Sequence, residues 1–499
     1  MKLLALRLDD HDSNMCLFDD GKVSYVKTER LYQNKHHAYN NNWEWTHDLK
    51  EFFGVTPSDI DEIAIVADPL RYNIKHSKSF VVKPFFGLQG AKCPVWHVEH
   101  HYAHALSDWM FGKTKWQFVF DGVGEVYNNN DAVTGVTWSV YKDYKLVHQN
   151  KGPFIQTNEA GMTVQTSFGV EYENLARYVG LEAGHPNDLA GKLMSLQSFG
   201  KFDDTFDGEL LPEEWQKHKG ETVGDLTKLD MARTFHVLLG KGIQEIINKY
   251  ATPKDSILFT GGCAQNICWN TDLKNLYPKL VVTPHGADDG LSLGCIKWLA
   301  DKNKVDLHRT NFPYWQQDTA PEEPTQETIE ATAKLLAEGK IVGWYQGHGE
   351  VGPRALGNRS ILMNPMLKDA KHIINTKVKH REDFRPFGAT VLEEYQDEYF
   401  SLDFSNPHML YYSKVKKHIP SITHIDGTCR FQTLGNENKV YRQLIEAFYK
   451  LTGVPLLLNT SLNRGGKPIA GCKKDALGIL HDTGLDVVVY GNEIIYASA

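Results

Sequence analysis

The sequence has few of the features that mark secreted and membrane proteins. Its seven cysteines are scattered over 499 residues, are odd in number and form no CxxC pair. A disulfide framework or a zinc ribbon is therefore not expected. No apolar run approaches the ~18 residues that a membrane-spanning helix needs. The opening MKLLALRLDD reaches acidic residues too early for a secretory signal. We expect a cytoplasmic protein with free thiols and no membrane partner.

A strong positive charge is also absent. Lysine and arginine total 54, aspartate and glutamate total 62, and the formal net charge is −8. This balance disfavours broad non-specific binding to nucleic acid, although a local basic groove remains open. The length predicts two to four domains at roughly 100–200 residues each. Polar residues and proline dominate residues 302–326, where we place a domain boundary.

The remaining pattern indicates an α/β fold. Apolar residues recur with helical spacing over 229–250, and again over 328–336 after the boundary. An Asp-Gly pair between two apolar runs, at residues 20–21, predicts a β-hairpin. Strands are expected at residues 3–8, 15–18, 23–26, 63–66, 117–120, 257–259, 280–282 and 341–345. Helices between strands predict layered α/β domains.

Two histidines suggest a metal site. His100 and His104 are spaced i, i+4, so on a helix both imidazoles point the same way. That spacing suits two ligands of one transition metal, with Fe, Zn or Mn as options. Asp288 follows an apolar run and could supply an oxygen ligand. The alternatives are a polar helix with incidental histidines and an aspartate that caps a helix.

Glycine-rich turns follow two of the expected strands. Asp121-Gly122 begins one turn, and Gly261-Gly262 belongs to the other. Such turns allow a phosphate or a ribose to approach the backbone closely. Neither matches a Walker A or GxGxxG pattern, so ordinary tight turns remain the alternative for each.

Arginine and glycine gather in the C-terminal part of the chain. The stretch GPRALGNRS begins at residue 352, VKHREDFRPF follows at residue 378, and Arg430 and NTSLN come later. An arginine in a loop stiffened by glycine and proline is typical of bidentate phosphate or carboxylate recognition. The alternative, a solvated basic face, is normally rich in lysine and free of such glycines.

Together these motifs resemble the O-carbamoyltransferases of the nodulation-factor and antibiotic-tailoring type. The matching stretches are HDSNMCLFDDGKV with Glu29-Arg30, HHYAHALS, DGVGE, GKLM, GGCAQNICWN, GPRALGNRS, VKHREDFRPF, THIDGTCRFQT and TGVPLLLNTSLN. They occur in the family's order over nearly the whole chain. Departures are small, such as Ser195 where glycine is usual and Leu462 where phenylalanine is usual.

The resemblance implies two domains and a two-step reaction. Residues 1–315 would form an actin-like (ASKHA-type) duplicated α/β domain, similar to the metalloprotein that makes threonylcarbamoyladenosine in tRNA. Residues 320–499 would form a YrdC-like α/β domain. Such enzymes make carbamoyl adenylate from carbamoyl phosphate and ATP, and then transfer the carbamoyl group to a hydroxyl. Mg²⁺ would accompany the ATP.

The resemblance also implies roles for individual residues. His100, His104 and Asp288 would hold a divalent metal, with Fe favoured over Zn or Mn. His11 would take the proton of the acceptor, because imidazole titrates near working pH. Arg354 and Arg430 are expected to be catalytic. Carbamoyl phosphate would be bound by Arg354, Lys379, Arg385, Arg430, Ser461 and Asn463. The nucleotide would lie along Asp121, Gly122, Gly261, Gly262 and Asn266.

Alternatives concern the acceptor and the class of protein. One is N-carbamoylation of the tRNA threonylcarbamoyl type, and another is a catalytically silent binding module. A sugar-like metabolite is our first expectation, and a hydroxymethylated pyrimidine, as nucleotide or in DNA, is the second. DNA would need a basic groove, for which the aromatic-rich stretch from Arg71 to Lys92 is the one suggestion. The sequence leaves the oligomeric state open.

Overall fold

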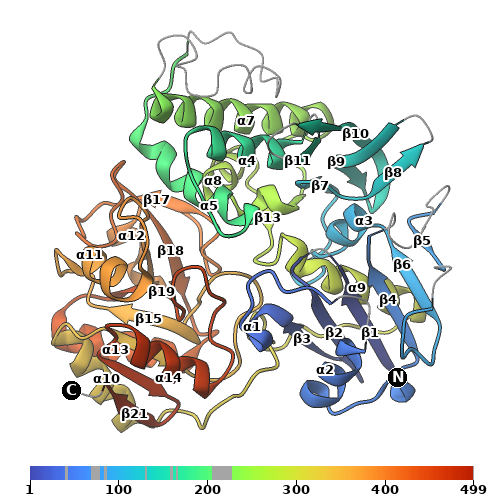
Figure 1. Cartoon of the computed structure of the whole chain (residues 1–499). Helices are drawn as coiled ribbons and strands as arrows, with labels where there is room; N and C mark the ends of the chain where they lie inside the picture. Colours follow the sequence, from blue (N-terminus) through green and yellow to red (C-terminus); the bar gives the residue numbers. More distant parts are fainter. Residues whose placement is uncertain are drawn as a thin grey trace. The chain divides into compact units, whose positions relative to one another are not determined.

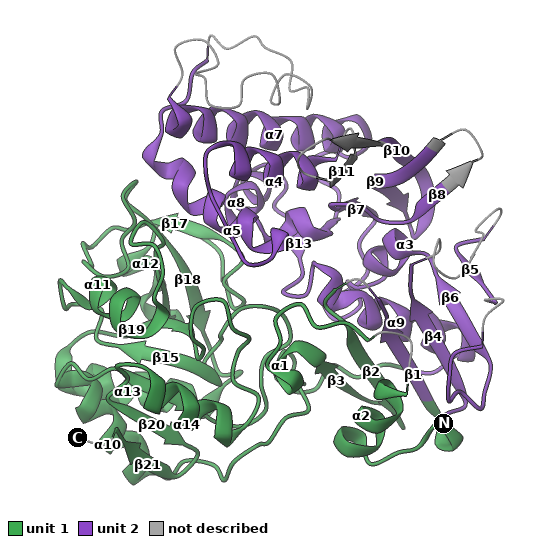
Figure 2. Ribbon diagram, in the orientation of Figure 1, with its two compact units in different colours: residues 1–2, 11–59, 306–499 green, residues 3–10, 60–305 purple. Residues whose placement is uncertain are grey.

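The computed structural model describes residues 1–9, 11–39, 43–68, 79–83, 87–129, 132–157, 161–164, 167–204 and 227–497. They form two compact units (Figure 2). Unit 1 comprises residues 1–2, 11–59 and 306–499, and unit 2 comprises residues 3–10 and 60–305. The passage between the units at residues 305–306 lies inside the polar stretch 302–326. The domain limits 1–315 and 320–499 remain a prediction, because a division by packing does not define folding domains.

Unit 2 contains two groups of parallel strands. In the first group β1, β4 and β6 are parallel in that order, and β5 pairs antiparallel with β6. In the second group β7, β12 and β13 are parallel in that order, and β9, β10 and β11 extend the sheet antiparallel beyond β7. The bounds are β1 (Lys2–Arg7), β4 (Glu62–Val66), β5 (Val81–Val82), β6 (Val95–Val98), β7 (Trp116–Phe120), β8 (Val126–Asn129, beside β9), β9 (Ala132–Lys142), β10 (Lys145–Thr157), β11 (Gly161–Val164), β12 (Ile257–Thr260) and β13 (Leu280–Val282).

The helices of unit 2 are α3 (His100–Ala105), α4 (Phe168–Tyr178), α5 (Leu189–Leu196), α7 (Lys228–Tyr250), α8 (Ile267–Leu276) and α9 (Leu291–Asn303). Short helical turns are η1 in unit 1 (Pro57–Asp59), and η2 (Pro186–Asp188), η3 (Gln197–Phe199), η4 (Gly262–Gln265) and η5 (Asp288–Gly290) in unit 2. The helix expected over 229–250 is confirmed as α7, the long helix at the top of Figure 1. Its apolar residues at helical spacing are buried, which is why this segment forms an amphipathic helix.

Unit 1 begins with the predicted β-hairpin. Strands β2 (Asn14–Asp19) and β3 (Lys22–Lys27) pair antiparallel, and helices α1 (Thr28–Tyr32) and α2 (Glu44–Phe53) follow. Asp20 and Gly21 at the turn have φ values of 51° and 88°. Such left-handed values match the turn type that an Asp-Gly pair favours in a two-residue hairpin.

The C-terminal part of unit 1 is built on a mixed sheet of eight strands, in the order β17-β18-β16-β19-β15-β14-β20-β21. The strands are β14 (Val342–Tyr345), β15 (Arg359–Met363), β16 (Gly388–Leu392), β17 (Tyr412–Lys414), β18 (Thr428–Leu434), β19 (Leu456–Ser461), β20 (Val487–Tyr490) and β21 (Glu493–Tyr496). The helices are α10 (Gln326–Ala337), α11 (Ala370–Ile374), η6 (Asn375–Lys379, a π-helix), η7 (Glu393–Tyr395), α12 (Gln396–Tyr399), α13 (Lys439–Thr452) and α14 (Lys473–Asp482).

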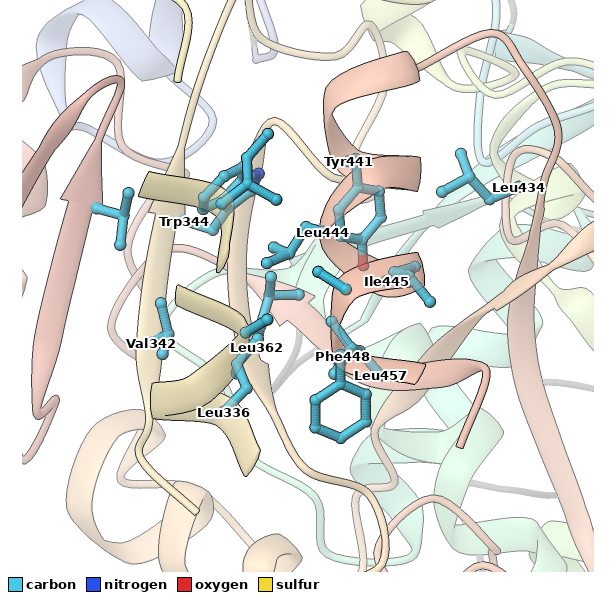
Figure 3. Packing of buried hydrophobic residues seen from close by; sticks show 14 of the residues in the cluster. Leu336, Val342, Trp344, Leu362, Leu434, Tyr441, Leu444, Ile445, Phe448 and Leu457 are labelled. Atoms are coloured by element: carbon cyan, nitrogen blue, oxygen red, sulfur yellow. The ribbon is translucent and has the colours of Figure 1, made fainter. Parts of the chain in front are cut away.

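A buried apolar cluster joins this sheet to its covering helices. Leu336 of α10 and Leu444 and Phe448 of α13 pack with Trp344 of β14 and Leu457 of β19 (Figure 3). The helix expected at 328–336 and the strand expected at 341–345 are thereby confirmed. The α/β class is confirmed in both units. Within the described residues, no helix is both long and apolar enough to cross a membrane.

Candidate active site

Four buried side chains converge in unit 2. The Nε2 atom of His100 lies 3.0 Å from Asp121 Oδ2 and 3.3 Å from Asp288 Oδ1. The Nε2 atom of His104 lies 3.3 Å and 3.5 Å from the same two oxygens. The four ligand atoms all lie within 4.8 Å of one another. Two imidazoles and two carboxylates in this arrangement form a donor set that suits a divalent transition metal.

Local packing explains how the helices bring these residues together. Glu99 caps α3 by accepting a hydrogen bond of 2.6 Å from the backbone N–H of Tyr102. Helix α9 approaches α3 so closely that a Cβ atom on Gly294 would lie 1.8 Å from the carbonyl oxygen of Ala103. Because Asp288 lies in η5, just before α9, this close approach places its carboxylate opposite the two histidines.

Asp121 is the member of this group that the sequence did not indicate as a metal ligand. We expected it beside a nucleotide. Its Oδ1 atom accepts hydrogen bonds from the backbone N–H groups of Gly122 (2.8 Å) and Gly262 (2.9 Å), which leaves Oδ2 to face the imidazoles. Gly261 adopts φ 91°, and a Cβ atom there would lie 2.2 Å from the carbonyl oxygen of Phe120. The two glycine-rich turns therefore meet at Asp121.

The charges in this cluster are strongly coupled. Burial alone would lower the pKa of His100, but Asp288 and Asp121 raise that pKa to about 10. Burial alone would raise the pKa of Asp121, but the neighbouring imidazoles of His100 and His104 hold it well below its ordinary value. Neither ring nitrogen of His104 has a hydrogen-bond partner in the described part of the chain. A buried imidazole directed at two carboxylates without a hydrogen bond fits a metal ligand.

Asn266 lies next to this group. Its Oδ1 atom accepts from the backbone N–H groups of Cys268 (3.1 Å) and Trp269 (3.3 Å), so it caps α8. Its Nδ2 donor is buried and has no partner among the described residues. The structure thus brings together the five residues expected at the nucleotide, namely Asp121, Gly122, Gly261, Gly262 and Asn266, through shared turns and the start of α8. Their contact with a nucleotide remains a prediction.

A second group, of cationic residues, lies in unit 1. The ammonium group of Lys379 is buried and donates to the side chain of Asn463 (2.6 Å), to Ser461 Oγ (3.3 Å) and to backbone carbonyls of both residues. Ser461 Oγ donates to Asn463 Oδ1 at 2.6 Å. These contacts join the end of η6 to the end of β19. Three of the residues expected to bind an anion are therefore in direct contact.

Arg381, Arg385 and Arg430 are near enough to Lys379 or to one another for mutual repulsion. Burial, Arg381 and Arg385 lower the pKa of Lys379 well below its ordinary value. Burial together with Arg385 and Arg430 lowers the pKa of Arg381 to about 9. Burial lowers the pKa of Arg430 to about 10; Cys429 opposes this shift, and Arg385 adds a smaller lowering effect. Sequence reasoning did not select Arg381, although it belongs to the same VKHREDFRPF stretch.

A buried glutamate, Glu350, orders the loop that carries Arg354. Glu350 Oε1 accepts from the backbone N–H groups of Leu356 (2.8 Å), Asn358 (2.9 Å) and Arg359 (3.2 Å). Arg354 itself is half-buried. Arg359 is not part of the cationic group, because it pairs at 2.8 Å with Asp318 in the interior of the unit.

Anion binding to this group is expected to take up protons. A bound anion raises the pKa of Lys379 from its lowered value, so between the two pKa values the complex holds more protons than the free protein. Affinity should therefore fall as the pH rises through that window. Calorimetry with sulfate, whose own charge is constant, in two buffers of different ionisation enthalpy measures the proton number. Release of protons on binding would contradict this assignment.

His11 lies in unit 1 within a separate polar cluster. Its Nδ1 atom and the Nδ1 atom of His36 are each 2.9 Å from Asp12 Oδ2. Lys27 Nζ lies 3.2 Å from both Asp12 Oδ1 and Glu29 Oε1. Although burial alone would raise it, Lys27 and the two histidines hold the pKa of Asp12 well below its ordinary value. An ionised Asp12 therefore orients the imidazole of His11.

The basic stretch considered for DNA is only partly visible. Arg71, Tyr72, Lys75, Lys78, Phe85 and Phe86 lie outside the described residues. Lys83 is described, and its ammonium group lies 5.1 Å from the centre of the Trp96 ring. A DNA-binding groove therefore remains a prediction from the sequence.

The chain is similar to proteins of known family. Residues 333–496 match the family model of the carbamoyltransferase C-terminus. The nodulation protein NolNO of Sinorhizobium fredii is 29% identical over 97% of this chain and 79% of its own length. An uncharacterized protein of Methanocaldococcus jannaschii, MJ1051, is 31% identical over 66% of this chain and 72% of its own length.

A named enzyme of antibiotic tailoring is also similar. The 3'-hydroxymethylcephem-O-carbamoyltransferase of Streptomyces clavuligerus is 34% identical over 42% of this chain and 43% of its own length. The family model, the relatives and the order of the motifs agree. The chain therefore belongs to the O-carbamoyltransferase family of transferase enzymes.

Proposed function

We propose that the protein is an ATP-dependent O-carbamoyltransferase that binds carbamoyl phosphate at the cationic group of unit 1. The observation that carries this proposal is the charge of that group. Lys379 is buried and Arg430 half-buried, and no acidic side chain of the described residues forms an ion pair with either. Arg385 differs from these two, since Glu382 lies 4.0 Å from its guanidinium group. Burying the positive charges of Lys379 and Arg430 is costly, and a compact dianion would offset that cost.

The fold that we propose for each unit follows the sheet order. In unit 2 the parallel set β1-β4-β6 is repeated as β7-β12-β13. This repetition supports a duplicated, actin-like architecture. For the C-terminal part of unit 1 we propose a YrdC-like fold, supported by its mixed eight-stranded sheet with the cationic residues near the ends of β19 and η6.

The first step forms carbamoyl adenylate. Carbamoyl phosphate, ATP and water give carbamoyl adenylate, inorganic phosphate and pyrophosphate. Arg354, Arg385 and Arg430 would hold the phosphate oxygens, because a guanidinium group makes bidentate, charge-assisted hydrogen bonds to phosphate. Lys379 would add a positive charge to the site. Its ammonium group is held in place by hydrogen bonds to Ser461 and Asn463. Arg381, whose Nε donates to Asn375 at 2.8 Å, would contribute to the same positive field.

A metal would be held by His100, His104, Asp121 and Asp288. These residues fit a divalent ion because two carboxylates balance its charge and both imidazole Nε2 atoms face the same point. Such an ion, iron being the one we favour, supplies Lewis-acid stabilisation of phosphate charge when bound. Asp121 is fixed by two backbone N–H groups, so its carboxylate is oriented before any ligand arrives.

The second step transfers the carbamoyl group to a hydroxyl. The hydroxyl oxygen attacks the carbamoyl carbon, the bond to the phosphate oxygen of AMP breaks, and the hydroxyl proton goes to a base. We propose His11 Nε2 as that base. Asp12, 2.9 Å from the other ring nitrogen, fixes the tautomer and stabilises the imidazolium that forms.

Replacing His11 by asparagine should separate the two steps. Pyrophosphate release should be unchanged, whereas acceptor carbamoylation should slow by about 10²–10⁴-fold, the usual contribution of a general base. A matched variant, His47→Asn, removes an exposed histidine of the same unit that pairs with Glu51. Equal slowing of both steps by His11→Asn would place His11 at the nucleotide instead.

The acceptor class can be resolved by a product screen. We propose a sugar-like hydroxyl, with a hydroxymethylated pyrimidine nucleotide or hydroxymethylated DNA as the second choice. The protein is incubated with carbamoyl phosphate, ATP and each acceptor, and mass spectrometry locates a gain of one carbamoyl group. Products on oxygen support the proposal. Products on the amine of a nucleobase or of threonine would instead favour N-carbamoylation.

A further inference from the structure

A buried arginine of the N-terminal segment contacts the loop that carries Arg354. Arg30 lies in the short helix α1 and is only 1% exposed. One of its terminal nitrogens donates to the carbonyl oxygen of Glu350 and the other to that of Gly352, both at 2.7 Å. No acidic side chain of the described residues pairs with it, and its Nε atom has no hydrogen-bond partner among them.

This pairing is unusual for a buried cation. Burying a guanidinium group is costly unless an anion compensates it, and here the compensation comes from two carbonyl dipoles. A lysine would be an imperfect replacement, because the guanidinium group gives each carbonyl its own terminal nitrogen in a fixed planar geometry. The backbone of Arg30 is closely packed as well, since a Cβ atom on Gly471 would lie 2.5 Å from the carbonyl oxygen of Arg30. Both the backbone and the guanidinium group of Arg30 are therefore held in place.

The loop is held from two sides. Glu350 binds the N–H groups of its second half, and Arg30 binds the carbonyls of its first half. Arg354 lies between the two sets of contacts. Both sets of contacts are made to the backbone of the loop, so they fix the backbone on either side of Arg354.

Helix α1 also contacts the polar cluster that contains His11. Lys27, directly before α1, pairs with Asp12, and Thr28 Oγ1 donates to the carbonyl oxygen of Ser13 at 2.8 Å. Glu29 accepts from the backbone N–H of His36 at 3.1 Å. All these residues belong to unit 1. Helix α1 therefore connects the polar cluster of His11 with the loop of Arg354.

We propose that Arg30 is a positioning residue that fixes the Arg354 loop to the segment carrying His11. The inference rests on the proposed function, because it assigns the loop to carbamoyl phosphate. Arg30 touches no substrate in this account. Its effect is to keep Arg354 in the orientation that binds the anion, and misplacement by about 1 Å can cost about 10²-fold in rate.

The test compares Arg30→Met, which removes the donors, with Arg30→Lys, which keeps the charge, in the full chain. Hydrogen exchange should become at least tenfold faster at the amides of Leu356, Asn358 and Arg359 and stay unchanged in β14. The KM for carbamoyl phosphate in pyrophosphate release should rise by about 10–100-fold, with a smaller change in kcat. Arg30→Lys should give intermediate values. Arg442→Met, which replaces a half-buried arginine of the same unit that pairs with Glu394, should change neither readout.

The outcomes of these experiments distinguish failure of the positioning role of Arg30 from failure of the proposed function. Unchanged exchange in the loop, or faster exchange with an unchanged KM, would overturn the positioning role. If Arg30→Met unfolds the protein, Arg30→Lys decides the question by the same two measurements. A wild-type protein that releases no pyrophosphate, but whose loop still loosens on substitution, would overturn the proposed function and leave the structural role of Arg30 in place.

Discussion

Protein in which both His100 and His104 are replaced by alanine is expected to purify without its divalent metal and to lose carbamoyl transfer. Two of the four converging donors disappear, and the two aspartates that remain are buried and repel each other. A metal that stabilises developing phosphate charge contributes several kcal/mol, so transfer should fall by at least about 10³-fold. Elemental analysis and a transfer assay on the same sample measure both effects.

The matched control is His101→Gln in the same helix. His101 is buried like its neighbours, but its Nδ1 atom lies 2.8 Å from Ser139 Oγ and it does not belong to the four-residue group. This variant should keep its metal. A full complement of metal in the double variant, or loss of metal from the control alone, would contradict the assignment of His100 and His104.

Arg430→Ala is expected to abolish carbamoyl-phosphate-dependent pyrophosphate release. A charge-assisted hydrogen bond contributes about 1.5–3 kcal/mol, which corresponds to about 10–150-fold per contact, and more if the bond is bidentate. The free energy of unfolding, in contrast, should not fall in this variant. Because burial disfavours the charged form of Arg430 and Arg385 repels it to a smaller extent, removing Arg430 should leave the melting temperature unchanged or raise it.

Loss of pyrophosphate release together with an unchanged or raised melting temperature would identify Arg430 as a binding residue. Loss of activity with a lowered melting temperature would instead indicate a structural role on β18. Arg442→Ala is the matched control, since this half-buried arginine pairs with Glu394 and Glu446 and does not belong to the cationic group. Its activity should be unchanged. Normal pyrophosphate release by Arg430→Ala would remove it from the site.

Local patterns made part of this structure predictable. The hairpin follows from an Asp-Gly pair between apolar runs, and α7 follows from apolar residues at helical spacing. The orientation of His100 and His104 follows from their i, i+4 spacing, which is a property of one helix turn. Each of these features depends on neighbours within a few residues, and the sequence displays such neighbours directly.

The position of Asp121 beside the histidines was not predictable from such local patterns. Its place beside the histidines depends on the parallel pairing of β7 with β12, strands separated by more than a hundred residues. The sequence did offer a signal, since carboxylates that follow neighbouring parallel strands come to the same edge of a sheet. Only the pairing of the strands shows that Gly122 and Gly262 hold one oxygen of Asp121 and direct the other to the imidazoles.

The contacts of Arg30 and Arg381 were equally hidden. Arg30 meets the carbonyl oxygens of Glu350 and Gly352, which are more than three hundred residues away in the sequence. The grouping of residues 11–59 with 306–499 depends on such contacts and not on composition. Arg381 is separated from Arg430 by β16 and β17, and their repulsion arises only once the sheet has formed.

The central claim is that unit 1 uses carbamoyl phosphate to convert ATP to an adenylate. The most direct measurement is release of pyrophosphate from ATP by the purified, metal-loaded protein, with and without carbamoyl phosphate and before any acceptor is added. We expect pyrophosphate only when both substrates are present, and Arg430→Ala should abolish the signal. Release of ADP instead of pyrophosphate, or carbamoylation of an acceptor without ATP, would contradict this claim.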